Sequence, residues 1–146
     1  MKSTPSTSVR QTEELLRITM RFVGAAALIY IGIKHFVAPE GFMMIMPPWM
    51  PAPLLLVQIS GFFEIAGALG LLFDKTRRFA GYGLVALFIA VFPANIYSAI
   101  YNINPIGPGP NWVLWARLPF QFVFIAWALW VSRAPRTAGH RKPLGP

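Results

Sequence analysis

The sequence predicts an all-α integral membrane protein whose four transmembrane helices form one bundle. Hydrophobic residues make up 55% of the 146 residues and charged residues only 12%, about half the charged share of an ordinary soluble domain. A chain this short cannot bury so much apolar surface inside itself, so lipid must cover part of it. Four apolar runs of about 20 residues each could cross a hydrocarbon core of ~30 Å at ~1.5 Å per residue.

The chain divides into a polar start, a membrane domain and a basic tail. Residues 1–16 are read as a polar tail, disordered to residue 10, followed by a helix start at Thr12. Thr12 is expected to cap that helix, with Glu13 and Glu14 in its first turn. Residues 17–132 form the membrane domain, and residues 133–146 are a basic cytoplasmic tail. The predicted spans are residues 18–37, 54–73, 79–100 and 112–132.

The connection over residues 39–53 contains five prolines and four methionines. So many prolines prevent a continuous helix. The segment is also too apolar for a free aqueous loop, so we expect it in the headgroup layer or folded back against the bundle. Clustered thioethers suit Cu(I), but no cysteine or second histidine supports such a site, and we predict no metal.

The positions of the cations predict the orientation. The connections after the first and third spans contain no lysine or arginine, so they are expected on the outside, and both termini in the cytoplasm. This makes the chain a multi-pass protein of the inner (plasma) membrane. The net charge of +8 follows the ends of apolar runs, which indicates contact with the lipid bilayer and no nucleic-acid binding. Eleven of the thirteen cations fall on one side: Lys2, Arg10, Arg17, Arg21, Lys75, Arg77, Arg78, Arg133, Arg136, Arg141 and Lys142.

Glu64 is the most informative side chain because it lies near the middle of the second span, about 15 Å from its start at Leu54. A charge at that depth costs about 3 kcal/mol or more unless it finds a partner. A stripe of small residues, including Ser60 and Gly61, runs along its helix face, so we expect Glu64 to point into the bundle. Two interpretations stay open: a hydrogen-bonded helix clamp, or a proton or ligand site.

Other polar side chains gather in the same outer half of the bundle. Arg117 lies about 8 Å below the outer surface and could either reach the lipid interface or pair with Glu64. Gln121 follows one turn deeper, and Asn95 comes late in the third span. Pro93 and Pro119 release backbone carbonyls nearby, those of Ile89 and Trp115. His35, at the outer end of the first span, is read either as a solvated edge or as a ligand.

The absence of cysteine excludes thiol–disulfide chemistry, iron–sulfur clusters and thiolate metal sites. Haem held by two histidines is also disfavoured, because the chain has only two and one lies in the tail. No cofactor is expected to be bound covalently, while a bound quinone is compatible with the residues present.

The motifs of this chain resemble those of the DoxX family of small bacterial membrane proteins over residues 17–132. The resemblance rests on GIKHFVAPEGF, PPWMPAP, SGFFEIAGALGLL, DKTRRFAGYGL, VFPANIYSA and WARLPFQFVFIAWALW, in this order. It implies a four-helix transmembrane bundle and, as in some members, association with membrane redox work such as a thiosulfate–quinone oxidoreductase or oxidative-stress enzymes. The bundle is similar in outline to that of vitamin K epoxide reductase, whose paired cysteines this chain lacks.

These observations lead to two main functional hypotheses; a transporter or proton path is a third, for which four short spans leave little room without oligomerisation. In the first, a redox-associated subunit binds a quinone-like or other lipophilic molecule in a cavity of the outer half, closed from outside by residues 39–53. The candidate ligand-binding residues are Glu64, Arg117, Asn95, Gln121, His35 and Ser60. In the second, the chain is a non-catalytic assembly or accessory protein whose polar core fixes helix packing. Whether the chain is itself catalytic, pairs with a partner in a membrane redox complex or forms a homo-oligomer stays open.

Overall fold

The computed structural model describes residues 7–105 and 107–133. In these ranges the secondary structure consists of helices joined by turns, with no strand. Four helices are long and apolar enough to cross a membrane, as predicted. The last three begin and end within two residues of the predicted spans, whereas the first begins ten residues earlier than predicted. In chain order the helices are α1 (Thr7–Val37), α2 (Glu40–Met44), α3 (Pro53–Leu72), α4 (Arg77–Tyr101) and α5 (Trp112–Val131).

The first helix begins earlier than the sequence predicted. α1 already includes Thr7, so residues 7–10 are helical and were wrongly predicted to be disordered. The prediction that Thr12 caps the start of the helix is wrong for the same reason. The Thr12 hydroxyl donates to the Ser8 carbonyl 3.0 Å away, which is the back-bonding of a helix interior. Residues 1–6 and the basic tail from residue 134 lie outside the described residues.

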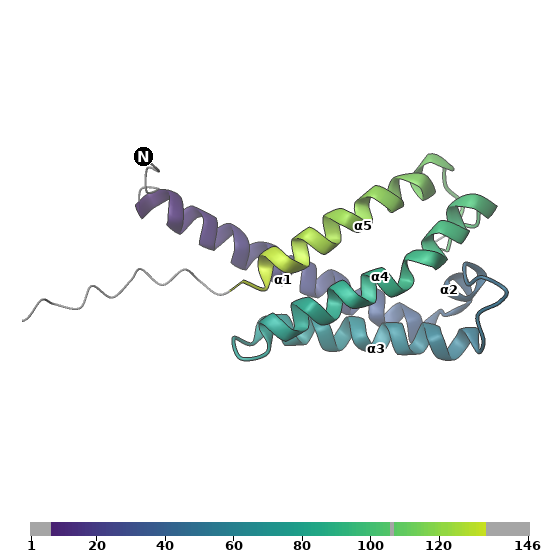
Figure 1. Ribbon diagram of the computed structural model, residues 1–146, viewed down its shortest axis with the longest axis horizontal. Coiled ribbons are helices and arrows are strands. Elements are labelled where there is room, and N and C mark those ends of the chain that lie inside the picture. Colours follow the sequence, from purple (N-terminus) through teal and green to yellow (C-terminus); the bar gives the residue numbers. More distant parts are fainter. Residues whose placement is uncertain (1–6, 106, 134–146) are drawn as a thin grey trace, which may run out of the picture.

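The long helices pack in chain order, α1 on α3, α3 on α4 and α4 on α5, while α1 and α5 share little contact. Figure 1 shows α5 crossing α1 and then running away from it toward the end that carries α2. We call that end the α2 end. The opposite end, with the α3–α4 turn and Arg17, Arg21 and Arg77, is called the basic end.

The close-packed core lies in the half of the bundle next to the basic end. Its buried side chains come from α3, α4 and α5, namely Leu71, Leu84, Phe88, Ala128 and Val131. Elsewhere large apolar side chains remain exposed on all four long helices, for example Phe62 at 60% and Phe122 at 64%. Exposure of this extent is compatible with contact to a lipid bilayer.

Buried arginines tie the helices together at the basic end. Arg21 on α1 donates from Nε to the Val131 carbonyl of α5 at 3.0 Å. Arg77 pairs with Asp74 and donates to the Leu71 carbonyl, so it fastens the α3–α4 turn. Arg17 pairs with Glu14 at 3.2 Å and lies 5.8 Å from the ring centre of Trp130. The predicted cluster of cations therefore also serves as internal bracing.

At the α2 end the proline-rich connection folds back against the bundle, one of the two placements predicted for it. Ile45 and Pro47 are buried, and α2 contacts α3. Gly41 lies so close to the α4–α5 connection that a β-carbon there would overlap the Pro105 carbonyl oxygen. The two connections therefore cover this end of the bundle together.

Candidate functional site

A cavity of about 740 Å³ lies between the four long helices, toward the α2 end. Its cover comes from α2 and the turn that follows, through Phe42, Ile45, Met46 and Met50, with Pro105 beside them. The walls are mostly apolar, and all six candidate residues predicted from the sequence line this one cavity. The structure thus contains a cavity lined by the predicted residues, while its place in the outer half of the membrane and its occupant stay predictions.

Two glycines determine how α1 and α3 approach each other beside the cavity. A β-carbon on Gly61 would lie 2.8 Å from the Gly32 carbonyl oxygen and 2.6 Å from the His35 β-carbon. Backbone therefore touches backbone across this contact, which only glycine allows. His35 follows Gly32 by three residues and Glu64 follows Gly61 by three, so the same contact brings these two side chains together.

The Glu64 carboxyl group lies beside the His35 ring. Its Oε2 lies 3.5 Å from His35 Nδ1, and both side chains are almost completely shielded from solvent. The same ring nitrogen lies 2.9 Å from the Ile31 carbonyl oxygen. Because a carbonyl oxygen only accepts, this geometry assigns the proton to Nδ1. The ring also stacks on Phe42 with centroids 3.9 Å apart, so the cover of the cavity holds the imidazole in place.

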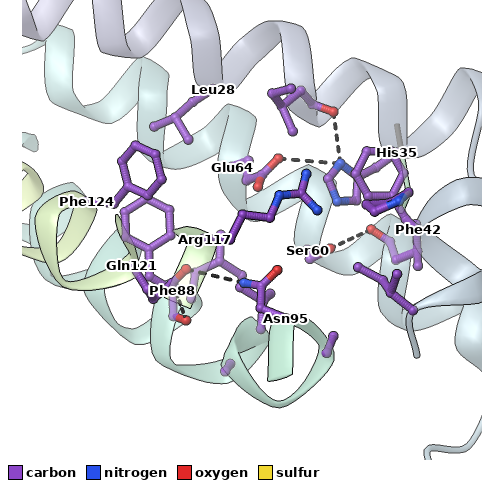
Figure 2. A pocket seen from close by; sticks show the side chains of 18 of the residues that line it. Leu28, His35, Phe42, Ser60, Glu64, Phe88, Asn95, Arg117, Gln121 and Phe124 are labelled. Atoms are coloured by element: carbon purple, nitrogen blue, oxygen red, sulfur yellow. Dashed lines mark hydrogen bonds and ion pairs between the residues drawn. The ribbon is translucent and has the colours of Figure 1, made fainter. Parts of the chain in front are cut away.

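The predicted pairing of Glu64 with Arg117 is wrong, because no ion pair within the described residues joins these two side chains. The charged or polar neighbour of Glu64 is His35 instead. α1 supplies a nearer partner for Glu64, whereas Arg117 comes from α5, which diverges from α1 at this end. In Figure 2 the Arg117 side chain nevertheless extends into the cavity toward the wall of Glu64 and His35. One of its terminal nitrogens, Nη1, is buried without a hydrogen-bond partner in the described chain, and so is Glu64 Oε2.

The other three polar residues of the cavity are bonded within the protein. Gln121 donates from Nε2 to the Phe88 carbonyl of α4, and its Oε1 accepts from Asn95 Nδ2 at 3.3 Å. The sequence predicted a released carbonyl at Ile89, and the neighbouring Phe88 carbonyl is the one that Gln121 binds. Ser60 donates to the Val57 carbonyl of its own helix at 2.8 Å. Figure 2 shows these bonds around the side chains of Glu64 and Arg117.

The structure also corrects the predicted environment of His35 and adds aromatic residues that were not among the predicted site residues. His35 is only 7% exposed, so the interpretation as a solvated edge is wrong. The sequence reasoning missed Phe42, which stacks on His35, and the aromatic wall made by Phe88, Phe124 and Trp127. One signal was available, because a glycine precedes both His35 and Glu64 by three positions.

Comparison with known proteins adds a family. A family described as a domain of unknown function (DUF8561) has a model that matches residues 25–132, most of the chain. The chain belongs to this family. No curated protein and no solved structure matches it. The matched residues include all six candidate residues, but the family description assigns no activity, so function has to be argued from the cavity.

Proposed function

We propose that this protein resides in the inner (plasma) membrane and binds a quinone-like or other lipophilic molecule in the cavity at the α2 end. The single observation that carries the proposal is a cavity of about 740 Å³ with apolar walls and with buried, unbonded polar atoms of Glu64 and Arg117.

The size and lining of the cavity support binding of a small molecule. Ligand pockets typically enclose about 300–1,000 Å³, with apolar walls and a few polar groups that orient the ligand. Here Leu28, Leu56 and Leu87 line the cavity together with aromatic rings, while the polar atoms come from a few side chains. Glu64 and Arg117 would orient the head of the ligand, and the apolar wall would surround its body.

The association with redox chemistry rests on the resemblance to the DoxX family. In that setting the protein acts as an accessory subunit of a membrane oxidoreductase, and the ligand is a quinone. A protein partner, or a second copy of the chain, would contact the exposed apolar helix faces. Binding of a lipophilic molecule in the cavity does not require this association.

A second candidate function, an assembly protein with a structural polar core, also has an observation in its favour. Gln121, Asn95 and Ser60 form hydrogen bonds within the protein, and Gln121 joins α5 to α4. This is the pattern expected of polar residues that hold helices together. It leaves Glu64 and Arg117 as the residues that separate the two candidate functions.

Thermal unfolding of the purified protein with ubiquinone and menaquinone analogues tests the proposal. A ligand that binds only the folded state raises the melting temperature. We expect the rise with the wild type, and its loss in Glu64→Gln and Arg117→Ala. Gln58→Leu is the control, because Gln58 lies on α3 outside the cavity lining. If no analogue or other lipophile shifts the wild type, the assembly function is favoured instead.

The proposed orientation has its own test. Reporter fusions at Lys75, in the α3–α4 turn, should report the cytoplasm, and fusions at Pro108, between α4 and α5, the outside. An external signal at Lys75 would reverse the orientation and leave the cavity on the cytoplasmic side.

A further inference from the structure

The cavity is open sideways, between α1 and α5. Several residues that line it are also exposed at the protein surface, including Val23 at 58% on α1, and Val123 at 57% and Phe124 at 48% on α5. Ala27, one turn beyond Val23, is likewise exposed and lines the cavity. Single lining positions on α3 and α4 are exposed as well, Ile59 at 42% and Ala90. α1 and α5 differ from the other neighbouring helices in sharing little contact, so the opening is assigned to the space between them.

The contacts between α1 and α5 explain why the opening lies there. They join Met20, Arg21 and Gly24 of α1 to Trp127 and Val131 of α5. Beyond Gly24, toward the α2 end, α5 runs away from α1, as Figure 1 shows. Because both helices are apolar enough to cross a membrane, the opening would face lipid acyl chains.

The buried polar atoms define what the head of an occupant must offer. A guanidinium only donates hydrogen bonds, so Arg117 Nη1 needs an acceptor. Glu64 Oε2 also needs a hydrogen-bond partner, and a carboxyl group accepts when ionised and can donate as well when protonated. His35 adds a second acceptor, because its Nδ1 proton is directed at the Ile31 carbonyl and Nε2 of the neutral ring is then free to accept. A head that both accepts and donates matches this set.

Resting on the proposed function, we infer that the ligand is a single-chain lipophile with a hydroxyl or phenol head, which enters from the bilayer between α1 and α5. Its hydroxyl oxygen accepts from Arg117 and its proton is donated to Glu64 or His35. Its chain lies along Ala27, Val123 and Phe124 and leaves the cavity through the lateral opening. Esters and ethers offer acceptors alone, so they leave the acceptors of this site unmatched.

A matched pair of probes tests the head group. We would titrate the full-length protein in phosphatidylcholine nanodiscs with 4-dodecylphenol and with its methyl ether, 4-dodecylanisole, and follow the melting temperature. The phenol should bind about tenfold more tightly, the equivalent of one hydrogen bond of about 1.4 kcal/mol. Glu64→Gln should reduce this preference, whereas Arg117→Ala should weaken the binding of both probes, because the oxygen of each can accept from Arg117. Equal stabilisation by both probes would overturn the inference while leaving the proposed function in place.

Tryptophan substitutions test the route. Ala27→Trp should fill the opening and abolish the shift caused by 4-dodecylphenol. Ala26→Trp should bind as the wild type does, because Ala26 is exposed on the same helix but does not line the cavity. Ala86→Trp on α4 is a second control, because Ala86 is exposed and does not line the cavity.

Several outcomes would contradict this account. Wild-type binding by Ala27→Trp overturns the route, as does loss of binding in Ala26→Trp or Ala86→Trp. Should Ala27→Trp fail to fold, Val123→Trp blocks the same opening from α5 and is judged by the same criteria. If neither probe stabilises the wild type while a ubiquinone analogue does, the inference alone fails. If the ubiquinone and menaquinone analogues fail as well, the inference and the proposed function fail together.

Discussion

The two halves of this bundle use the same four helices in different ways. Toward the basic end, glycines bring the helices into close contact: a β-carbon on Gly67 would lie 2.6 Å from Leu84, and one on Gly70 2.8 Å from Ala80. Toward the α2 end, α1 and α3 remain close through Gly32 and Gly61, while α5 diverges and leaves a cavity of about 740 Å³.

The polar groups are handled differently as well. At the basic end, Arg21 and Arg77 reach backbone carbonyls or an acid nearby, and Arg17 pairs with Glu14, although Arg17 Nε and Arg21 Nη2 are buried without a hydrogen-bond partner in the described chain. In the cavity, Arg117 Nη1 and Glu64 Oε2 are buried without such a partner as well. We infer that the closely packed basic end stabilises the fold, whereas the less closely packed α2 end contains the candidate binding site.

The largest expected effect is at the basic end. A β-carbon on Gly81 would overlap the Ser132 side chain and lie 3.2 Å from the Ala128 carbonyl oxygen, so Gly81→Val must force α4 from α5. We expect a loss of about 3 kcal/mol in the free energy of unfolding, the upper part of the usual range for overpacking. Denaturant titration in mild detergent measures it. Gly83→Val is the matched control on the same helix, because nothing lies within 4 Å of a β-carbon there. Equal losses in the two variants would contradict close packing at this end.

An intermediate effect is expected where the two halves meet. Gln121→Leu removes the bond to the Phe88 carbonyl and the one from Asn95, and should cost about 1 kcal/mol in unfolding free energy. Gln58→Leu makes the same chemical change outside the cavity and should be nearly neutral. A neutral Gln121→Leu would mean that this amide is not a helix clamp, which would weaken the assembly function.

The smallest effect concerns the contact at which α1 and α5 separate. Trp127 donates from Nε1 to the Met20 carbonyl at 3.3 Å and packs on Gly24. Trp127→Phe retains a ring but loses the hydrogen bond, and should cost about 0.5 kcal/mol. Trp115→Phe, at an exposed position on the same helix, serves as the reference. A loss well above that of Trp115→Phe, by several kcal/mol, would show that this one bond holds the two helices together.

The sequence predicted most of the fold because apolar run length and proline placement act locally. The runs of α3, α4 and α5 and the proline-rich cover needed no knowledge of packing. The start of α1 was missed because polar residues such as Ser8 and Thr12 are equally compatible with a tail and with a helix that extends beyond its apolar stretch.

The sequence predicted which residues line the candidate site, but it did not predict which of their side chains contact one another. Depth along each helix can be counted from the sequence, which is why all six residues line one cavity. Partners depend on how the helices are rotated and how far they diverge. The Gly32–Gly61 contact places His35 beside Glu64, and the divergence of α5 keeps Arg117 away from it.

The most direct test of the central claim, that the cavity binds a lipophilic molecule, is native mass spectrometry of the protein purified in mild detergent. We expect the wild type to retain a bound small molecule of defined mass. Arg117→Ala and Glu64→Gln should lose it, while Gln58→Leu retains it. A wild type that carries no such molecule, or variants that carry it to the same extent, would contradict the account and leave the polar cavity as an element of helix packing.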